Sequence, residues 1–514
     1  MYCLDKARIV PEELDYVVFY DKPFVKFDRI LTSCISTFPR SRRLFVKVIP
    51  LWLKERLFAG ERLQRLLGDV PVIFCEHHLS HAASAFFVSP FEDSAIITVD
   101  GVGEWSTVAL GHGHHKTISL EKEIRFPHSL GLLYNAITAY LGFRVNWDEY
   151  KVMALASYGK PSFRKQFEEI ISLNDDGSFK LNMGFFSYDH SYTTMFSERL
   201  VKLFGSPPRS LSDPINQFHR DIAASAQEVL ETALIRLARH AYSLYGLENL
   251  CIAGGVGLNC VANAKIVKQT PFKRIFIQPA AGDDGAALGA AYFAHHQLLG
   301  NERDFIMRHA YWGPEYSNKD IELFLNNKSI SFEKLDEKAL VEKAASCIAE
   351  NKIIGWFQGR MEWGPRALGN RSILANPLHR ETRTIINQKI KNRKDFQPFA
   401  ASVLDEEASD MFELQESPFM LLAVKVKEHM LSRLPAVVHV DGTCRIQTVS
   451  QDTNELFYAL LKKVKEKIGV SVLLNTSLNY ADDPIACSPE DAVRCFLKTG
   501  IDCLFMGNCV LSRR

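Results

Sequence analysis

Two histidines in the first third of the chain have a spacing that suits metal binding. The segment His77-His78-Leu79-Ser80-His81 puts His77 and His81 four residues apart, and side chains four apart share one face of a helix. On their own they equally suit two hydrogen-bonded core histidines, because the glutamate of the metalloprotease H-E-x-x-H pattern is missing. Two acids at predicted strand ends, Asp100 and Asp283, supply carboxylates, so we predict one site where a metal and a nucleotide meet.

Glycine-rich turns belong to the same predicted site. Glycine lets backbone amides come close to a phosphate, so such turns are typical of nucleotide sites. The second turn departs from the dinucleotide spacing G-x-G-x-x-G, and an ordinary tight turn before a helix also explains it. The residues concerned are Gly101 and Gly103 in the first turn, and Gly254, Gly255 and Asn259 in the second.

A second concentration of charge begins in residues 359–372 and predicts a site for a small phosphorylated substrate. Arg366 and Arg371 lie there among glycines and apolar residues, although a solvated basic face is the alternative. A guanidinium fixed by Gly and Pro turns binds phosphate oxygens with two hydrogen bonds, which a mobile lysine cannot do. The basic pattern continues through Lys391, Arg393 and Arg445. Asn475 follows a predicted strand, where it is either an amide donor for a carbamoyl group or part of a turn.

Buried strands and long helices must position these residues. Strands are predicted over residues 15–21, 95–100, 250–254 and 274–279, and a helix over residues 222–244 with Gly246 as its C-cap. Strands that alternate with helices indicate an α/β fold, in which ligand sites gather at the carboxyl ends of strands. The apolar patterning breaks near residues 300–335. We therefore predict one domain over residues 1–315 and a second over residues 330–514.

The composition excludes several classes of protein. The 514 residues carry 61 Lys+Arg against 60 Asp+Glu, and a net charge of +1 gives no broad surface for nucleic acid or anionic lipid. No apolar run reaches the roughly 18–20 residues of a membrane helix, and the start lacks a signal peptide's apolar core, so we expect a soluble, cytoplasmic protein. The 11 cysteines form no C-x-x-C pair, which favours reduced thiols.

One basic and apolar stretch, residues 29–58, has two interpretations. It includes Phe45, Val46, Leu51 and Leu53 among arginines and lysines. Such a segment attaches some proteins to a membrane surface. The simpler interpretation is that its helices cover an apolar face of their own domain, with the basic stems lying over that face.

Taken in order, the motifs resemble those of the O-carbamoyltransferases of the nodulation-protein-U and cephamycin-carbamoylation type, over nearly the whole chain. The resemblance implies an actin/hexokinase-like nucleotide domain followed by a YrdC-like α/β domain. It also implies a reaction: ATP-dependent transfer of a carbamoyl group from carbamoyl phosphate, through carbamoyladenylate, to a hydroxyl of a glycan or secondary metabolite. The motifs that carry it are residues 77–86, 99–104, 149–153, 254–259, 364–372 and 474–477.

Residue by residue, the resemblance assigns roles to the candidate site. The metal ligands fall on His77, His81, Asp100 and Asp283, a donor set suited to Fe(II), Mn(II) or Zn(II). Glu149 falls on the ribose position, and Gly254, Gly255 and Asn259 fall on the adenosine-side loop. The cations for carbamoyl phosphate fall on Arg366, Lys391 and Arg445. No nucleic acid is expected, and a homodimer is compatible with the family.

The chain departs from the family pattern in two places. Gln397 stands where the family commonly has arginine before Pro-Phe-Ala, and Arg393 is a candidate to compensate for the lost charge. Family members also open with a strand-turn-strand hairpin that this chain lacks, so we expect either a fragment or an impaired enzyme. The alternatives are therefore a truncated, non-catalytic homologue that binds a nucleotide or sugar, and an enzyme that carbamoylates threonyl groups on tRNA.

Overall fold

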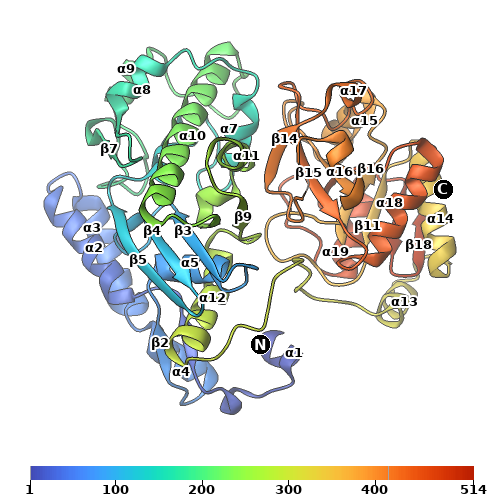
Figure 1. The fold of residues 1–514 in the computed structure, drawn as a ribbon, viewed down its shortest axis with the longest axis horizontal. Helices are drawn as coiled ribbons and strands as arrows, with labels where there is room; N and C mark the ends of the chain where they lie inside the picture. The colour runs from blue at the N-terminus through green and yellow to red at the C-terminus, as the bar shows by residue number, and fades with distance from the viewer. Residues whose placement is uncertain (1, 415, 514) are drawn as a thin grey trace. The chain divides into compact units, whose positions relative to one another are not determined.

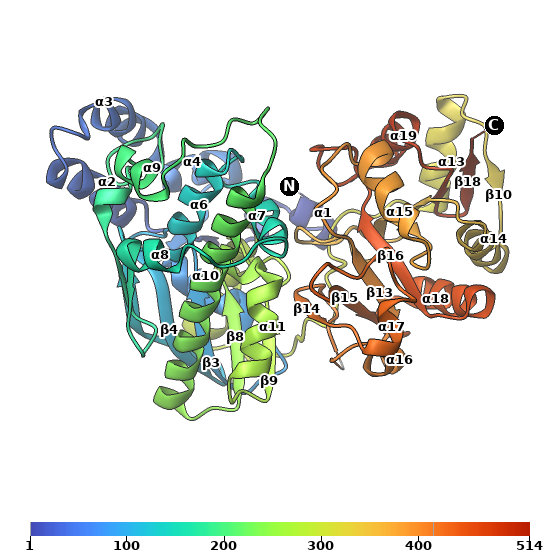
Figure 2. The same ribbon diagram turned by 90° about the horizontal axis from the view of Figure 1, so that it is seen from above.

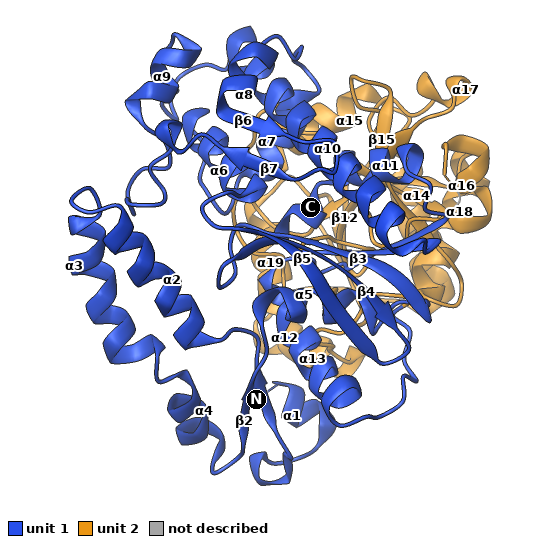
Figure 3. Ribbon diagram, turned by 60° about the vertical axis from the view of Figure 1, so that its left-hand side comes forward, with its two compact units in different colours: residues 1–307 blue, residues 308–514 orange. Residues whose placement is uncertain are grey.

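The computed structural model describes residues 2–414 and 416–513, and the chain divides into two compact units, residues 1–307 and 308–514 (Figure 3). Both units combine helices with a β-sheet, which confirms the predicted α/β class. Among the described residues, no helix combines the length and the apolar character that a membrane crossing needs. The domain limits drawn above, residues 1–315 and 330–514, stay predictions.

A five-stranded sheet forms the centre of the first unit, in the order β5-β4-β3-β8-β9 (Figure 1). Strands β3, β4 and β5 are antiparallel, while β8 pairs with β3 in parallel and β9 with β8. The bounds are β3 Asp93–Val99, β4 Ser106–His114, β5 Thr117–Arg125, β8 Asn249–Ala253 and β9 Arg274–Ile277. Residues 94–99 of β3 are all buried, as expected of a strand whose two faces are both covered.

Helices cover both faces of this sheet (Figures 2 and 3). Helix α5, His77–Phe86, packs on one face, and α12, Asp283–Tyr292, packs against α5. Helix α10, Gln217–Tyr245, packs on the other face and confirms the predicted helix, with Gly246 left-handed at its C-cap. Around α10 lie α6 Leu130–Tyr140, α7 Glu149–Ala156, α8 Arg164–Ile170 and α11 Cys260–Gln269.

Glycine makes the contact between α5 and α12 possible. A Cβ atom added at Gly289 would overlap the carbonyl oxygen of Ser80 and crowd the amide of Ser84. The two helix backbones therefore touch at this point, as the small residues 286–291 predict. Helix α5 carries both candidate histidines, and α12 begins at Asp283. This contact therefore sets the distance between the histidines and Asp283.

The N-terminal part of the first unit is a helical extension beside a short parallel pair of strands. It comprises α1 Tyr2–Ala7, β1 Val17–Phe19, α2 Pro23–Ser36, α3 Arg42–Leu51, a π-helical turn Trp52–Arg56, α4 Ala59–Leu67 and β2 Val72–Phe74. Ile49 is buried, whereas Phe45, Val46, Leu51 and Leu53 are exposed. The prediction that this stretch covers an apolar face of its own domain is therefore wrong for these four side chains, which point to solvent.

The remaining elements of the first unit are short, namely β6 Ile171–Leu173, β7 Phe179–Leu181 and α9 Glu198–Phe204. Strands β6 and β7 form an antiparallel pair of their own. After β7 comes a 3-10 helix, Met183–Phe185, and then a loop over residues 186–196 whose ends meet in an antiparallel bridge between Phe186 and Phe196.

The second unit is built on a nine-stranded mixed sheet in the order β10-β18-β17-β11-β12-β16-β13-β15-β14. Its strands are β10 Glu333–Lys334, β11 Ile354–Phe357, β12 Arg371–Ala375, β13 Ala400–Leu404, β14 Leu422–Lys425, β15 Thr443–Val449, β16 Val472–Ser477, β17 Cys503–Met506 and β18 Cys509–Ser512. Its helices are α13 Asn318–Asn327, α14 Glu337–Ala349, α15 Arg380–Ile385, α16 Asp405–Met411, α17 Glu428–Leu431, α18 Glu455–Ile468 and α19 Pro489–Lys498. Helices α14 and α18 pack with Trp356, Leu374 and Leu473 into one apolar core.

Candidate functional site

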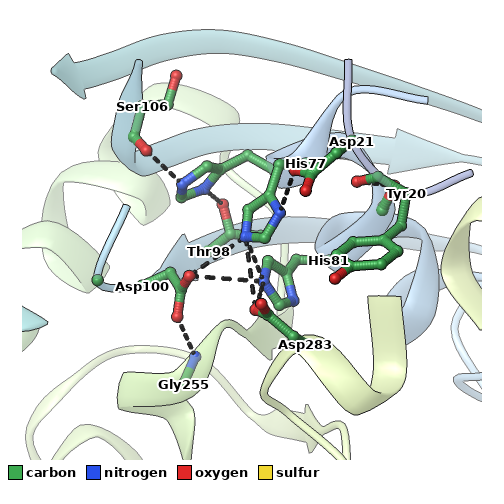
Figure 4. Close-up of polar contacts among 12 residues, drawn as sticks. Tyr20, Asp21, His77, His81, Thr98, Asp100, Ser106, Gly255 and Asp283 are labelled. Carbon is green, nitrogen blue, oxygen red and sulfur yellow. Dashed lines mark hydrogen bonds and ion pairs between the residues drawn. The ribbon is translucent and has the colours of Figure 1, made fainter. Parts of the chain in front are cut away.

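Two histidines and two aspartates meet in the first unit (Figure 4). His77 and His81 lie on α5, Asp100 follows β3, and Asp283 is the first residue of α12. The Nε2 atoms of the two imidazoles are 3.1 Å apart, and Nε2 of His77 is 3.2 Å from Oδ2 of Asp100. Both Nε2 atoms lie 3.6 Å from Oδ1 of Asp283. The predicted four residues therefore form a single cluster of donor atoms.

The cluster is buried on the side of the histidines and open on the side of Asp283. The side chains of His77 and His81 are at most 1% exposed, whereas that of Asp283 is 55% exposed. Two imidazoles and two carboxylates within 4.8 Å of one another are ligands that first-row divalent cations accept. The residues present fit such a cation, and the open side gives it access to a ligand.

Asp21 supports the cluster from behind. Its Oδ1 lies 3.0 Å from Nδ1 of His77, and its Oδ2 lies 2.7 Å from Nζ of Lys26. A proton on Nδ1 donated to Asp21 leaves the Nε2 lone pair of His77 directed at Asp100 and Asp283. Sequence reasoning missed Asp21 as a site residue, although the predicted strand 15–21 ends at this acid.

Charges inside the cluster depend strongly on one another. Burial lowers the pKa of His77, but hydrogen bonds to Asp100 and Asp21 outweigh it and raise this pKa to about 10. Burial raises the pKa of Asp100, but the hydrogen bond from His77 and the charge of His81 bring it well below its usual value. The carboxylates therefore favour a positive charge among them, which a proton or a metal cation supplies.

The glycine turns predicted for a nucleotide lie directly against these ligands. The amide of Gly255 donates to Oδ1 of Asp100 at 2.9 Å, and a Cβ atom at Gly103 would lie 2.8 Å from the imidazole of His77. The carbonyl of Gly101 accepts a hydrogen bond from Ser129 at 2.6 Å. Gly254 has φ 91°, a left-handed conformation that favours glycine. These contacts place both turns at the cluster, and their contact with a phosphate stays a prediction.

Two other residues predicted on the nucleotide side have structural partners. Oδ1 of Asn259 accepts from the amide of Ala262 and caps α11, while its Nδ2 donates to Gln227 at 3.0 Å. Glu149 begins α7, and its Oε1 accepts from the amide of Asn146 at 2.7 Å. Burial raises the pKa of Glu149. Their predicted contacts with adenosine and ribose stay predictions.

Glu104 holds the start of α5. Its carboxylate accepts from the amide of His77 at 3.0 and 3.1 Å and from the amide of Lys22 at 2.9 Å. A carboxylate at this position satisfies amides that the first turn of a helix leaves free. Glu104 thereby joins the turn after Asp100 to the helix that carries the two histidines.

In the second unit, Lys391 is buried at one end of the sheet. Its Nζ donates to the carbonyl and hydroxyl of Ser477, at 2.5 and 3.1 Å, and to the carbonyl and Oδ1 of Asn479, at 3.2 and 2.5 Å. All four acceptors are neutral oxygens. Burial and the nearby charge of Arg393 hold the pKa of Lys391 well below its usual value.

Arg371 has a supporting position. Its guanidinium is fully buried, lies 3.7 Å from the centre of the Phe357 ring, and donates to the carbonyls of Gln358, Gly359, Pro314 and Asn370. In the same loop, Oε1 of Glu362 accepts from three amides, those of Leu368, Asn370 and Arg371. These bonds fix the loop that presents the half-buried Arg366. A direct ligand contact by Arg371 stays a prediction.

Hydrogen bonds and strand register connect the other predicted residues to the same end of this sheet. In β13, Ala400 pairs with Arg445 on one side and Asn475 on the other. Gln447, two residues beyond Arg445, donates to the carbonyl of Leu368 in the loop of Arg366. Nε of Arg393 donates to Asn387 at 2.6 Å, and its guanidinium lies 4.5 Å from the centre of the Phe399 ring.

The structure corrects one expectation about Asn475. Its Nδ2 donates to Ser402 at 2.8 Å, so the predicted amide donor is used inside the protein. Among the described residues, Oδ1 of Asn475 and Oε1 of Gln397 are buried without hydrogen-bond partners. These two oxygen atoms are therefore the hydrogen-bond acceptors that Asn475 and Gln397 offer to a ligand. The predicted strand, residues 470–474, would place Asn475 after its end, but Asn475 lies inside β16 and pairs with strands on both sides. The sequence pattern also could not show which atom of Asn475 its neighbours would use.

Comparisons with known proteins identify relatives along the whole chain. Residues 1–292 match the family model described as carbamoyltransferase N-terminus, and residues 345–513 match carbamoyltransferase C-terminus. The protein sll1178 of Synechocystis is 44% identical, with 100% of this chain and 89% of that protein covered. Nodulation protein NolNO of Sinorhizobium fredii is 37% identical, with 100% of this chain and 74% of that protein covered. A HypF crystal structure from T. kodakarensis has 15% identity and a TM-score of 0.29, over 48% of this chain and 39% of that one.

Proposed function

The chain belongs to the carbamoyltransferase family, and on that premise we propose that it moves a carbamoyl group from carbamoyl phosphate to an acceptor hydroxyl with the use of ATP. Carbamate is a poor electrophile because it lacks a good leaving group. In the proposed reaction, water first cleaves carbamoyl phosphate to carbamate and inorganic phosphate. A carbamate oxygen then attacks the α-phosphate of ATP, which forms carbamoyladenylate and releases pyrophosphate, so that AMP becomes the leaving group. The acceptor hydroxyl then attacks the carbamoyl carbon of the adenylate and releases AMP.

The cations of the second unit support the proposal for carbamoyl phosphate: Lys391 is buried, and Arg366, Arg393 and Arg445 are half-buried. Lys391 is surrounded by neutral oxygens, and the strongest charge that acts on it is another cation, Arg393. A cation next to a buried lysine is costly, and an anion bound beside Lys391 and the half-buried Arg393 would lower that cost. Arg366 and Arg445 would complete a cationic site for the phosphate group. The acceptor atoms of Asn475 and Gln397 suit the NH₂ group of a carbamoyl.

In the first unit we assign a divalent metal to His77, His81, Asp100 and Asp283, with Fe(II) as the first choice and Mn(II) or Zn(II) as alternatives. When bound, such a cation polarises phosphate or carbonyl oxygens. Asp21 orients the imidazole of His77, and the amide of Gly255 orients the carboxylate of Asp100. Glu104 joins the turn that follows Asp100 to the start of α5, and so holds Asp100 close to His77 and His81.

ATP is proposed for the same cluster because the fold brings glycine turns to it. The antiparallel meander β3-β4-β5, extended by the parallel strands β8 and β9, supports an actin/hexokinase-like domain. Gly101, Gly103, Gly254 and Gly255 follow strands of that sheet at their carboxyl ends. Glycine at these positions lets a phosphate approach the backbone closely, although the amides of Gly103, Gly254 and Gly255 donate to the carbonyls of Ser106 and Ala281 and to Oδ1 of Asp100. Glu149 and Asn259 are the proposed residues for the ribose and adenosine.

The test is formation of AMP and pyrophosphate that depends on carbamoyl phosphate. The full chain is incubated with ATP, carbamoyl phosphate and Fe(II), Mn(II) or Zn(II), and products are separated by ion-exchange chromatography. Acetyl phosphate in place of carbamoyl phosphate is the matched control, because it keeps the phosphate and lacks the carbamoyl NH₂. A folded protein that binds ATP but forms no carbamoyl phosphate-dependent AMP with any of the metals would contradict the proposal.

A further inference from the structure

A cavity of about 510 Å³ lies in the first unit, within the volume range of small-molecule sites. Its walls come from α2, α3 and α6 and from the loop around Tyr188 and Asp189. Val102, two residues beyond the candidate metal ligand Asp100, is part of the wall. The cavity therefore shares the turn 101–104 with the metal cluster.

One charged side chain in this cavity has no partner. Arg29 is 8% exposed, and its guanidinium lies 4.9 Å from the centre of the Phe126 ring. Within residues 2–414 and 416–513, Nε of Arg29 has no hydrogen-bond partner and no carboxylate forms an ion pair with the guanidinium. Burial lowers the pKa of Arg29 to about 10, so the group is charged at neutral pH. A buried charge without a partner is costly and marks a place for an opposite charge.

The other deeply buried arginines show what a purely structural guanidinium does in this protein. Arg209 donates to five backbone carbonyls, and Arg371 donates to four. Arg29 differs because it faces a cavity in place of carbonyls.

The carboxylates closest to Arg29 are occupied. Asp21 binds His77 and Lys26, and Glu104 binds the amides of His77 and Lys22. Asp189, which lines the cavity, pairs with Nδ1 of His190 at 2.5 Å. The charges of Asp21 and Glu104 favour the charged form of Arg29 from a distance, but neither carboxylate forms an ion pair with it, so its hydrogen-bonding capacity is left for a ligand in the cavity.

The rest of the wall suits a polyhydroxylated ring. Asn135 donates to Oδ1 of Asn146 at 2.8 Å, which leaves Oδ1 of Asn135 and Nδ2 of Asn146 for a ligand. The hydroxyl of Ser33 donates to the carbonyl of Arg29 and that of Thr193 contacts Ser191, so their oxygens serve as acceptors. Tyr192 supplies an aromatic ring, with Nζ of Lys47 4.1 Å from its centre. Amides and hydroxyls bind sugar hydroxyls, and aromatic rings pack on the apolar faces of sugars. The combination of these groups with one buried cation points to a sugar that carries an acid.

We propose that this cavity holds the acceptor of the carbamoyl group, and that Arg29 selects a sugar or similar polyol bearing an anionic group, such as a carboxylate or a phosphate ester. The inference rests on the proposed function, since it names the acceptor class for that reaction. Arg29 binds the anionic group, while the amides and hydroxyls hold the ring with one hydroxyl toward the turn 101–104.

The experiment compares three probes that differ in charge. Glucose is the neutral probe, and glucuronate and glucose 6-phosphate add a carboxylate or a phosphate to the same ring. Dissociation constants are measured by NMR titration of the full chain and of the variants Arg29→Gln, Arg29→Lys and Arg43→Gln. Arg43 is an exposed arginine on the neighbouring helix α3 and serves as the matched control.

We expect at least one anionic probe to bind the unchanged protein roughly tenfold to a hundredfold more tightly than glucose. Arg29→Gln should remove most of that preference, Arg29→Lys should keep part of it, and Arg43→Gln should keep all of it. If glucuronate binds more tightly than glucose 6-phosphate, the preferred anion is a carboxylate; if glucose 6-phosphate binds more tightly, it is a phosphate.

Equal binding of the three probes to the unchanged protein, or binding of none, would overturn the inference even if the Arg29 variants failed to fold. If Arg29→Gln instead weakened ATP binding and left probe binding unchanged, the anion would belong to the nucleotide and the inference would be wrong. Pyrophosphate formation without any acceptor tests the proposed function separately. A protein that forms pyrophosphate yet prefers no anionic probe would contradict only the acceptor assignment.

Discussion

Asp21 and His77, 56 residues apart in the chain, are joined by a hydrogen bond of 3.0 Å between Oδ1 and Nδ1. This contact sets which nitrogen of His77 faces the metal cluster. Asp21→Asn keeps the shape of the side chain but removes its charge, so we expect metal affinity to fall roughly tenfold or more. Asp28→Asn, on the exposed part of α2, is the control. The affinity of each variant for Zn(II) is measured by calorimetric titration. Equal Zn(II) affinities for Asp21→Asn and Asp28→Asn would show that Asp21 does not support the site.

Because α12 and α5 touch at Gly289, we expect that adding one methyl group there lowers the stability of the protein strongly. Gly289→Ala forces the helices apart at Ser80, and we expect a loss of about 1–3 kcal/mol in the free energy of unfolding. Metal affinity should fall as well, because Asp283 moves with α12. Gly282→Ala is the matched control, since a Cβ atom there meets nothing within 4 Å. Urea unfolding that gave the same stability for both variants would refute this account of the contact.

Substitutions in one proposed binding site should weaken binding at that site and leave binding at the other site nearly unchanged. His81→Ala removes one metal ligand and should abolish most metal binding while carbamoyl phosphate binding persists. Arg366→Ala should weaken carbamoyl phosphate binding by about 1.5–3 kcal/mol, roughly a tenfold to hundredfold loss, and leave metal and ATP binding nearly unchanged. Calorimetric titration of each variant with each ligand checks this. Loss of metal binding in folded Arg366→Ala as severe as in His81→Ala would mean that both clusters line one site.

His439 predicts how the stability of the second unit varies with pH. Burial lowers its pKa to about 4, while Nδ1 and Nε2 bind Thr443 and the carbonyl of Phe399. The unfolded chain, with a histidine pKa of about 6.5, binds a proton between pH 6.5 and 4 that the folded chain does not. Stability should therefore decrease as the pH falls through this window, by about 1–3 kcal/mol.

The variant His439→Gln provides the control for that pH dependence. Glutamine can form both hydrogen bonds but does not titrate in this range. Denaturation curves at several pH values between 4 and 6.5 should show a flatter dependence for the variant than for the unchanged protein. Parallel curves would assign the pH dependence to other groups.

Much of the first unit could be predicted because its signals are local. Strand β3 is mostly apolar from Ala95 to Val99 and is followed by an acid, and α10 has a helical repeat that ends at Gly246. His77 and His81 share a helix, so their spacing alone places them together. Asp100 and Asp283 could be added because both stand at the ends of recognisable elements.

The other features of the site depend on which way a side chain points and on how deeply it is buried. The spacing of residues in the sequence does not give either. Arg366 and Arg371 look alike in sequence, yet Arg371 turns inward to four carbonyls. Asp21 reaches His77 only after β1 has paired with β2. The apolar side chains of Phe45 and Val46 follow a helical pattern that normally indicates a buried face, and they are exposed all the same.

The metal cluster also has a consequence for the order of events during synthesis. Its histidines leave the ribosome early, but α12, with Asp283, follows roughly 200 residues later. At ordinary rates of translation this delay is on the order of 10–40 s. Until then the nascent chain has two imidazoles and Asp100 but no fourth ligand, and α5 lacks the helix that packs against it. Stable binding of the proposed metal would therefore be a late step, which follows emergence of almost the whole first unit.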